Sequence, residues 1–448
     1  MVIGLQDLLT RESYSLVSNA NHSDEKMFAN RISLYELLLL SGLVTALTLG
    51  TAWLYPIWDD ARLLFLIGEL GSGAIQTNFG DRPLAAALFT FLFSHQLFFP
   101  IGIVFHWITW LGMGLVTMRL WQLMFPAYSR FALLPALLSI APVLCKVQLV
   151  TFTVVFLPLL GPVLTFLAIF MLLSEQPSLW RRIIVVTGAL ALIAFSILIS
   201  QYAVPTAAIA IVFLTAKVFR SRRKERRQVL VITALLVICA LGSYLMFCWL
   251  TRSTVRQTYE PSYAVQSLSW KMKVIPFRLL SSLWRGAIGG VLESLGAVTL
   301  GSKIALLSFV CGAVFSGLVT LAVYKRAAVG SPLSQNRLSV ITLLAATVVA
   351  LMPVLLLDRT PGYDWDSRFW VPMSPILSNL TVFIFLSVLR RRLWLLVPVL
   401  CGFLAGYWTT SEIANTIRNR DDVYKGNRCR TSALRFKGHS RNHRLRNL

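Results

Sequence analysis

An acidic pair, Asp59 and Asp60, follows the first long apolar stretch of the chain, and Asp81, Arg82 and Pro83 stand just before the next one. A carboxylate at the start of a helix is a good N-cap, and one of the two paired acids can serve in that way. A carboxylate can also accept the proton of an attacking hydroxyl, while nearby cations stabilise a phosphate that leaves. The pair is therefore either a helix cap or the base for a group transfer from a phosphate carrier.

A second cluster of charged residues lies far along the chain, in "DWDSRFWVPMSP" at 364–375. The guanidinium of Arg368 offers a planar fork that matches phosphate oxygens and stays charged near a membrane. Alternatively, Arg368 extends from a helix end to lipid headgroups. Asp364 and Asp366 either hold Arg368 in place or bind a divalent cation together with loop waters.

The composition identifies the class of protein that must position these residues. Of the 448 residues, 56% are hydrophobic and only 14% are charged, and the mean hydropathy is +0.69. A soluble chain would carry roughly a quarter charged residues. The excess of 42 Lys and Arg over 19 Asp and Glu lies mostly in short runs between apolar segments, which favours topology signals over nucleic-acid binding. No Cys or His spacing indicates a metal site, and we expect none.

We predict an all-α polytopic membrane protein with about 11 to 13 transmembrane helices, since each span needs about 20 apolar residues. Residues 1–33 are expected to form a cytoplasmic segment and 34–411 the transmembrane domain, while 412–448 is a basic, disordered tail. The expected outer loops are 56–83, 251–302 and 358–370.

The basic runs predict the orientation of the spans. "RSRRKERR" at 220–227 and "RRR" at 390–392 can both face the cytoplasm if the segments between them cross in pairs. With the N-terminus inside, this requires 84–98 to enter the membrane only in part or to share a single crossing with the next segment. The number of spans does not decide between these two possibilities. Counting onward from "RRR" places the basic tail outside, against the rule that basic segments face the cytoplasm.

Two outer loops have the pattern of amphipathic helices at a membrane surface. Arg62 begins a short stretch whose apolar and polar residues alternate at helical spacing, which predicts an interfacial helix in the first loop. In the loop 251–302, Lys271 and Arg278 alternate with aromatic residues and leucines. Such a surface either anchors the chain in the headgroups or binds a polyprenyl-phosphate headgroup and a sugar face.

The block "WDDARLLFLIGELGSG…NFGDRPLAAAL" resembles the first periplasmic loop of GT-C membrane glycosyltransferases. These include protein O-mannosyltransferases, aminoarabinose transferases and phage-type O-antigen glucosyltransferases. The shared pattern is an acidic pair after the first span, an interfacial helix, and a basic-Pro-Leu motif, here Arg82-Pro83-Leu84. The "GDRPL" form favours the glucosyltransferase branch. Arg368 and the prolines that follow it resemble a late motif of the same families. The element of the family pattern that this sequence does not show is a recognisable soluble C-terminal domain.

The resemblance implies a glycosyltransferase that moves a sugar from a polyprenyl-phosphate donor to a hydroxyl of a cell-envelope glycan, lipid or protein. Asp60 would be the general base, with Asp59 as its alternative, and Arg368 would contact the donor phosphate. Other residues expected near the substrate are Arg62, Asp81, Arg82, Asp366, Lys271 and Arg278. The expected location is the inner membrane, with the site facing the periplasm. The resemblance implies no particular cofactor, and a divalent cation at Asp364 and Asp366 stays open.

Two other functions share the same substrates. A flippase of lipid-linked glycans should place charges inside its spans and often shows two similar halves, whereas these spans are nearly free of charge and show no repeat. An O-antigen polymerase or ligase is expected to concentrate arginines in a large outer loop, as 251–302 does in part. The acids of the first loop favour the transferase.

Overall fold

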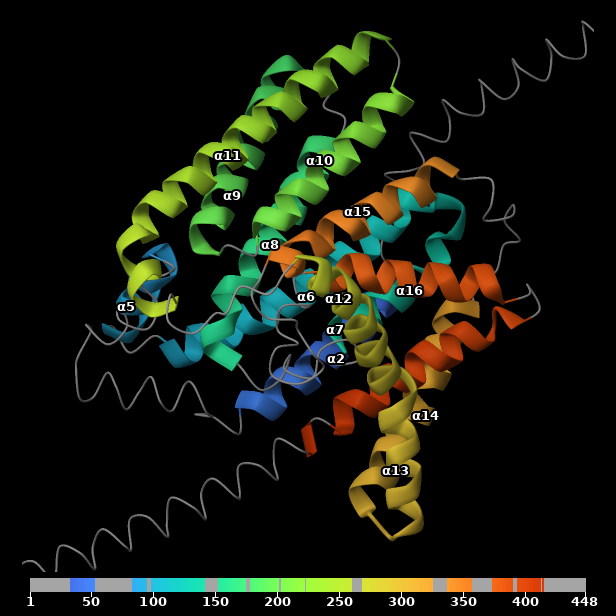
Figure 1. The fold of residues 1–448 in the computed structure, drawn as a ribbon. Coiled ribbons are helices and arrows are strands. Elements are labelled where there is room, and N and C mark those ends of the chain that lie inside the picture. The colour runs from blue at the N-terminus through green and yellow to red at the C-terminus, as the bar shows by residue number, and fades with distance from the viewer. Residues whose placement is uncertain are drawn as a thin grey trace, which may run out of the picture.

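The computed structural model is a helical assembly, and no strand occurs in the part of the chain that it describes (Figure 1). The described residues are 33–52, 83–94, 98–141, 152–174, 178–200, 203–221, 223–259, 268–324, 337–356, 373–389, 393–411 and 413–414. Predicted segments outside these ranges, among them the interfacial helix of the first loop, most of residues 1–33 and nearly all of the tail, are not described.

Hydroxyl side chains within the helices bond back to the carbonyl four residues earlier. Thr117 donates to the oxygen of Met113 at 2.7 Å, and Thr347 donates to that of Leu343 at 2.8 Å. Many other serines and threonines do the same, for example Thr48, Thr90, Thr165, Ser196, Thr233, Thr320 and Thr381. This pairing lets a polar group sit in a helix that has no water beside it.

Large apolar side chains cover much of the outer surface. Four helices in the described part are long and apolar enough to cross a membrane, at Ile103–Met124, Leu179–Ile199, Glu225–Thr251 and Lys303–Tyr324. Only 11% of the apolar window of Glu225–Thr251 is buried inside the protein, so most of its leucines, valines and isoleucines face outward. Monomeric soluble proteins rarely expose apolar patches of this size. Shorter apolar helices occur elsewhere in the described ranges, among them Leu34–Thr48, Ala203–Phe219 and Leu396–Ser411.

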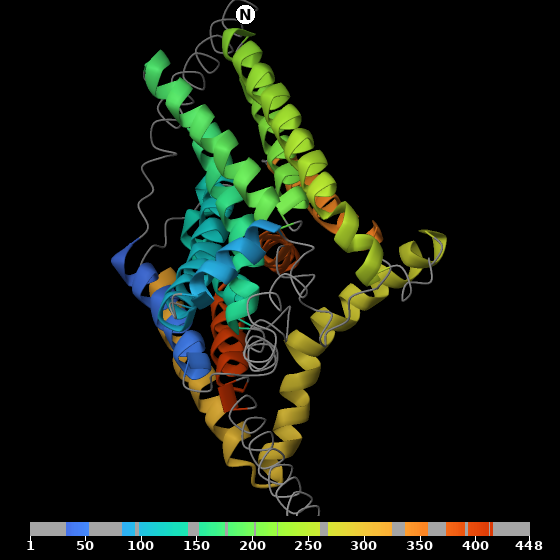
Figure 2. The ribbon, with the colours of Figure 1, turned by 90° about the vertical axis from the view of Figure 1, so that its left-hand side faces the viewer.

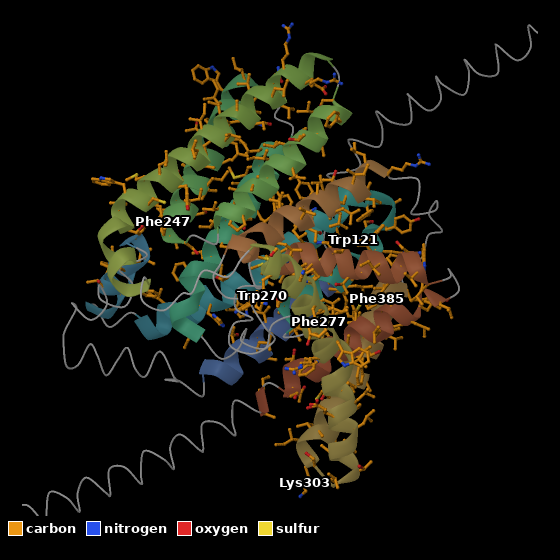
Figure 3. The ribbon with its side chains drawn as sticks, in the orientation of Figure 1. Trp121, Phe247, Trp270, Phe277, Lys303 and Phe385 are labelled. Atoms are coloured by element: carbon orange, nitrogen blue, oxygen red, sulfur yellow. The ribbon has the colours of Figure 1, made fainter. Side chains whose placement is uncertain are left out.

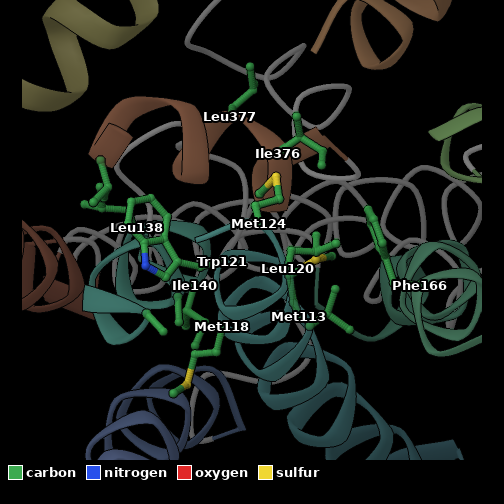
Figure 4. Close-up of a cluster of buried hydrophobic side chains, with 14 of the residues drawn as sticks. Met113, Met118, Leu120, Trp121, Met124, Leu138, Ile140, Phe166, Ile376 and Leu377 are labelled. Carbon is green, nitrogen blue, oxygen red and sulfur yellow. The ribbon is translucent and has the colours of Figure 1, made fainter. Parts of the chain in front are cut away.

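The core forms where α6 (Phe98–Met124) meets α7 (Leu133–Ile140) and α16 (Ser374–Val388). The indole of Trp121 is fully buried and donates to the oxygen of Tyr128 at 2.7 Å, which joins α6 to the short 3-10 helix η1 (Pro126–Phe131) (Figure 4). The ring of Phe125 stacks on that of Phe383 with centroids 5.4 Å apart. α16 therefore runs in the direction of α6, and its end lies near the end of α6.

The first described helix, α2 (Leu34–Ala52), runs antiparallel to α6. Trp107 donates to Thr45 Oγ1 at 3.0 Å, while a Cβ built on Gly114 would lie 3.5 Å from the side chain of Leu40. α2 therefore ends on the side where α6 begins. Between them, α5 (Pro83–Ser94) has only 12 residues, about 18 Å of helix, which is too short to cross a bilayer.

Four antiparallel helices form a layer on one side of the core (Figure 1). They are α8 (Phe152–Leu173), α9 (Leu179–Ile199), α10 (Ala203–Arg220) and α11 (Arg223–Tyr259). Lys217 donates to the oxygen of Leu173 at 2.6 Å, and Arg182 donates to Gln228 at 2.6 Å. The ends of α8 and α10 and the starts of α9 and α11 therefore meet, next to the basic run 220–227.

A long arm continues from α11 (Figure 2). It consists of α12 (Leu268–Trp284), the π-helix η3 (Arg285–Gly289), α13 (Gly290–Thr299) and α14 (Lys303–Tyr324). Gly301 has a φ of 82°, and the amides of Gly301 and Ser302 donate to the oxygens of Val298 and Ala297. This hydrogen-bond pattern ends α13 and turns the chain into α14, and it requires a left-handed residue. The turn lies at the opposite extreme of the molecule from the connection between α10 and α11.

Helix Leu396–Ser411 packs tightly on α14 through small residues. Ser316 donates to the oxygen of Val399 at 3.0 Å, and a Cβ on Gly402 or Gly406 would lie within 3.0 Å of α14 atoms. Small residues let two helices approach closely where apolar surroundings provide no hydrophobic driving force. Trp394, just before this helix, lies beside Tyr128 and Phe131 near the end of α6.

The predicted elements and the observed ones differ mainly in their bounds. The predicted outer loop begins at 251, but α11 continues to Tyr259. Its last turns are therefore helical although they are polar. Helices were predicted in the loop 251–302, and α12 and α13 occur there. The last long element before α16 is α15 (Arg337–Leu356), as its apolar run predicts.

We expect Gly406→Ala to destabilise the protein, because the new methyl group would meet the Cβ of Phe315 at 2.8 Å and the oxygen of Cys311 at 2.9 Å. Overpacking of this kind costs about 1–3 kcal/mol. Thermal unfolding in detergent, followed by circular dichroism, measures the loss. The control is Gly317→Ala on α14, where nothing lies within 4 Å. Equal unfolding temperatures for the two variants would contradict the packing.

Candidate functional site

Most of the predicted site residues lie outside the residues that the structure describes. These are Asp59, Asp60, Arg62, Asp81, Arg82, Asp366 and Arg368. Lys271 and Arg278 lie on α12, but the structure does not describe their side chains. The described helices nevertheless fix the points from which the chain leaves toward each predicted residue, and these points limit where the site can be.

Two tethers limit the position of the predicted catalytic groups. Asp60 stands eight positions after Ala52, the last residue of α2, so its backbone lies within about 28 Å of that helix end. Arg368 stands six positions before Ser374, the first residue of α16, which limits it to within about 20 Å of that start. The directions of α2 and α16 therefore decide whether the two groups can meet.

α2 ends and α16 begins on the same side of the described helices. Ala52 lies toward the start of α6, because α2 and α6 are antiparallel. At the other end, Trp394 donates to the oxygen of Leu389, the residue after α16, and its ring contacts Tyr128 beyond the end of α6. The start of α16 therefore points toward the start of α6. We call the side that holds Ala52 and Phe98 the loop end.

The junction of α12 and α13 also belongs to the loop end. The hydroxyl of Tyr407 donates to the oxygen of Gly290 at 3.1 Å, and the ring of Trp408 leaves no room for a Cβ on that glycine. Tyr407 lies near the far end of helix Leu396–Ser411, away from Trp394. The end of α2, the start of α16 and the end of α12 therefore lie toward one end of the molecule.

An aromatic stripe lies along α12, on which Trp270, Phe277 and Trp284 recur at every seventh residue and so share one side of the helix. Their side chains are exposed by 41%, 71% and 55%, and Figure 3 shows the first two. Exposed tryptophans on an amphipathic helix are typical of the boundary between a membrane and water. The stripe agrees with the interfacial helix predicted for this segment.

Buried polar side chains fasten the start of α16 to α6 and α7. The Ser374 hydroxyl donates to the oxygen of Ser139 at 3.0 Å, and Ser139 Oγ lies 3.0 Å from Thr117 Oγ1. The Asn379 amide donates to the oxygen of Pro375 at 2.6 Å and reaches that of Thr117 at 3.4 Å. These side chains are fully buried. Directional bonds in a low-dielectric interior hold a helix in one register, so they fix where the segment carrying Arg368 begins.

Two atoms of this polar cluster have no hydrogen-bond partner among the described residues. They are Ser378 Oγ and Asn379 Oδ1, both fully buried. An unpaired buried polar atom costs about 1–3 kcal/mol. The cluster therefore costs stability at the base of the loop that carries Arg368, and such unsatisfied groups often mark a strained or functional place.

The described carboxylates have positions that suit structure better than catalysis. Glu36 is buried at the start of α2, where its Oε2 accepts from the amide of Ser33 at 2.9 Å while Ser33 Oγ accepts from the amide of Glu36. This reciprocal pair is a capping box. Glu225 lies in the first turn of α11, near the basic run, and Glu293 is exposed on α13. None of these three described carboxylates is one of the predicted site residues, and all the predicted acids lie outside the described residues.

Sequence reasoning did not single out His106 or the cluster around Asn379. His106 is buried in α6, and its Nε2 accepts from the indole of Trp110 at 3.1 Å, so the pair packs as a neutral imidazole against an indole. The signal that could have found Asn379 is its position in an apolar segment, where an amide needs a partner. Within the described ranges, no group of three His, Cys, Asp or Glu side chains can hold a metal ion.

Comparison with known proteins adds no relative: no family model, curated protein or solved structure matches this chain.

We expect Asn379→Ala to lower the free energy of unfolding by about 1–3 kcal/mol, because it removes the bonds to Pro375 and Thr117 from a dry interior. Ser378→Ala should be neutral or slightly stabilising, since its hydroxyl has no partner among the described residues. Thermal unfolding in detergent measures both effects. Ser387→Ala is the control, since its exposed hydroxyl bonds only within α16. A loss with Ser378→Ala as large as that with Asn379→Ala would contradict the assignment.

Proposed function

We propose that this chain is a polytopic membrane glycosyltransferase that uses a polyprenyl-phosphate-linked sugar. The proposal starts from two motifs in the sequence, the acidic pair of the first loop with "GDRPL", and "RFWVPMSP" before α16. The observation that carries it is the shared loop end: α2 and α16 direct the attached ends of both motif segments to one side. Attachment at opposite ends would have separated an acid from the cation that it must face across one substrate.

The reaction is a single displacement at the anomeric carbon. Asp60, or Asp59 in its place, accepts the proton of the acceptor hydroxyl as its oxygen forms the new bond to the carbon. The bond from that carbon to the phosphate oxygen breaks, and its electron pair leaves with the polyprenyl phosphate. Arg368 stabilises the negative charge that gathers on this phosphate. The new glycosidic bond has the inverted configuration.

The remaining predicted contacts would line the same space. Arg62, Asp81 and Arg82 come from the first loop, and Asp366 comes from the late one. Lys271 and Arg278 come from α12, whose exposed aromatic stripe suits a lipid boundary and the faces of sugars.

The membrane orientation that goes with this proposal places the loop end outside the cytoplasm. Because α2 ends and α6 begins at the same end, α5 enters the membrane only in part, which is the choice that brings the basic runs to the cytoplasmic side. The aromatic stripe of α12 then lies at the outer surface, and the run 220–227 lies at the inner one. The acceptor is a hydroxyl of a cell-envelope glycan, lipid or protein.

Asp60→Asn should reduce sugar transfer at least about 100-fold, since loss of a general base typically costs that much. The assay follows release of polyprenyl phosphate from a radiolabelled polyprenyl-phosphate hexose in membranes that contain the full chain and an envelope fraction as acceptor. Asp59→Asn is measured beside it to assign the base.

The control for these variants is Asp421→Asn combined with Asp422→Asn, the other pair of adjacent aspartates in the chain. This double variant should transfer sugar at the rate of the parent. Full activity in both Asp59→Asn and Asp60→Asn would exclude the catalytic assignment.

Arg368→Gln should raise the KM for the donor and lower kcat, because it removes a charge-assisted contact to the leaving phosphate. Arg337→Gln, at the start of α15, removes the same charge elsewhere and should leave both constants unchanged. The same transfer assay, with varied donor concentration, separates the two effects. Unchanged kinetics in Arg368→Gln would contradict the phosphate role.

The orientation predicts which cysteine variants an impermeant reagent can reach. In a background without the six native cysteines, Ser72→Cys and Ser367→Cys should react with a charged maleimide in intact cells. Ser221→Cys, between α10 and α11, should react only after the membrane is permeabilised. Reaction of Ser72→Cys and Ser367→Cys from opposite sides would remove the shared loop end.

A further inference from the structure

A pocket of about 180 Å³ lies among α8, α9, α10 and α11, far from the loop end. Its polar lining consists of Ser174, Arg182, Lys217, Glu225 and Gln228. Ser174 directly follows α8, and the other four come from α9, α10 and α11. The pocket adjoins the run 220–227, which holds six arginines and lysines and one glutamate, so its surroundings are strongly positive.

Hydrogen bonds between helices hold the two cations of the pocket in place. Lys217, on α10, donates to the oxygen of Leu173 at the end of α8. Arg182, on α9, donates through one nitrogen to Gln228 on α11 at 2.6 Å. A guanidinium has five N–H donors, and this bond uses one of them. The positions of both charges are therefore set by the packing of the helices rather than by flexible loops.

The rest of the pocket is apolar. Its walls are formed by Met171, Leu172, Val185, Val186, Val229 and Ile232. Beside it, Trp180 is exposed by 75% and Phe219 by 71%, at the start of α9 and near the end of α10. A ligand that satisfies this lining has an anionic group for the cations and an apolar part for the walls and the neighbouring rings.

We propose that this pocket binds the phosphate and glycerol region of an anionic diacyl phospholipid of the cytoplasmic leaflet. The inference rests on the membrane orientation of the proposed function and not on sugar transfer. The phosphodiester accepts from Arg182 and Lys217, and the acyl chains leave along the exposed apolar surfaces of α9 and α11. Basic pockets between transmembrane helices on the cytoplasmic side are suited to anionic lipid headgroups. Glu225 disfavours a second negative charge there, which selects a phosphodiester over a phosphate monoester.

The test measures binding of phosphatidylglycerol to the full chain purified in detergent, by native mass spectrometry and by titration of tryptophan fluorescence. The parent protein should bind one phosphatidylglycerol more tightly than the others, and phosphatidylcholine at least tenfold more weakly. Arg182→Gln combined with Lys217→Gln should weaken this binding at least tenfold. Val186→Phe, which fills the pocket without changing its charge, should do the same. This second variant decides the matter if the first one does not fold.

The matched control combines Arg181→Gln with Arg227→Gln, two exposed cations beside the pocket that do not line it. Its affinity should stay within about twofold of the parent. An equal loss in the control and pocket variants would show that only the diffuse positive field attracts lipid, and this would overturn the site. Glycerol 3-phosphate that binds as tightly as the lipid would overturn the assignment to a membrane lipid. Because the readout is lipid binding, it does not depend on whether the chain transfers sugar.

Discussion

The apolar outer surface of the described helices is the constraint on which the rest of the structure depends, because helices of this kind are suited to surroundings without water. In such surroundings a polar group needs a partner inside the protein, and unpaired groups cost several kcal/mol in hydrocarbon. Many of the described serines and threonines meet the requirement locally, by bonding to the carbonyl four residues earlier, and those bonds contribute little to the choice of neighbouring helices. In a membrane, hydrophobic burial would not select which helices pack together either, since lipid is as apolar as their side chains. The arrangement of helices must then come from close packing and from a small number of polar contacts between them.

Those contacts occur in a few places, and each fixes a direction. Small residues bring helix Leu396–Ser411 against α14, and the hydroxyl of Tyr407 joins its far end to Gly290. Ser374 and Asn379 lock α16 onto α6 and α7, and Trp107 sets the direction of α2. Together these bonds bring the attached ends of the charged segments to one side, although none of the bonds involves a charged residue. The Asn379 side chain bonds two carbonyls through its nitrogen, and this turns its oxygen away from them. Asn379 Oδ1 therefore has no hydrogen-bond partner among the described residues.

The sequence predicts the helices well and their contacts poorly, for physical reasons. An apolar run of about 20 residues indicates a helix whatever surrounds it, and "SLYE" indicates its start through local bonds, as Ser33 and Glu36 show. Hydropathy does not predict the length of α11, because its last turns are polar, or the close approach of Trp408 to Gly290 after the π-helix, because Trp408 comes from a helix far along the chain. The cluster at Asn379 needs three helices brought together and the pocket at Lys217 needs four, which no local pattern records. The roles of Asp60 and Arg368 remain sequence predictions, limited by the two tethers.

The charges of the chain are divided between its two ends, and this division follows from the same constraint. A helix that is dry on most sides cannot hold an unpaired cation or acid, so charged side chains gather where helices end. At one end the predicted site residues stand in the segments of the sequence that connect the helices, and this suits the chemistry proposed for them. At the other, Arg182 and Lys217 are tied to Gln228 and to the oxygen of Leu173, and this suits holding a ligand still. An enzyme that draws its donor from the membrane needs both, because the outer site can select a lipid-linked sugar only if the protein keeps a fixed depth. A lipid held between α8 and α11 would provide that fixed depth while taking no part in the reaction.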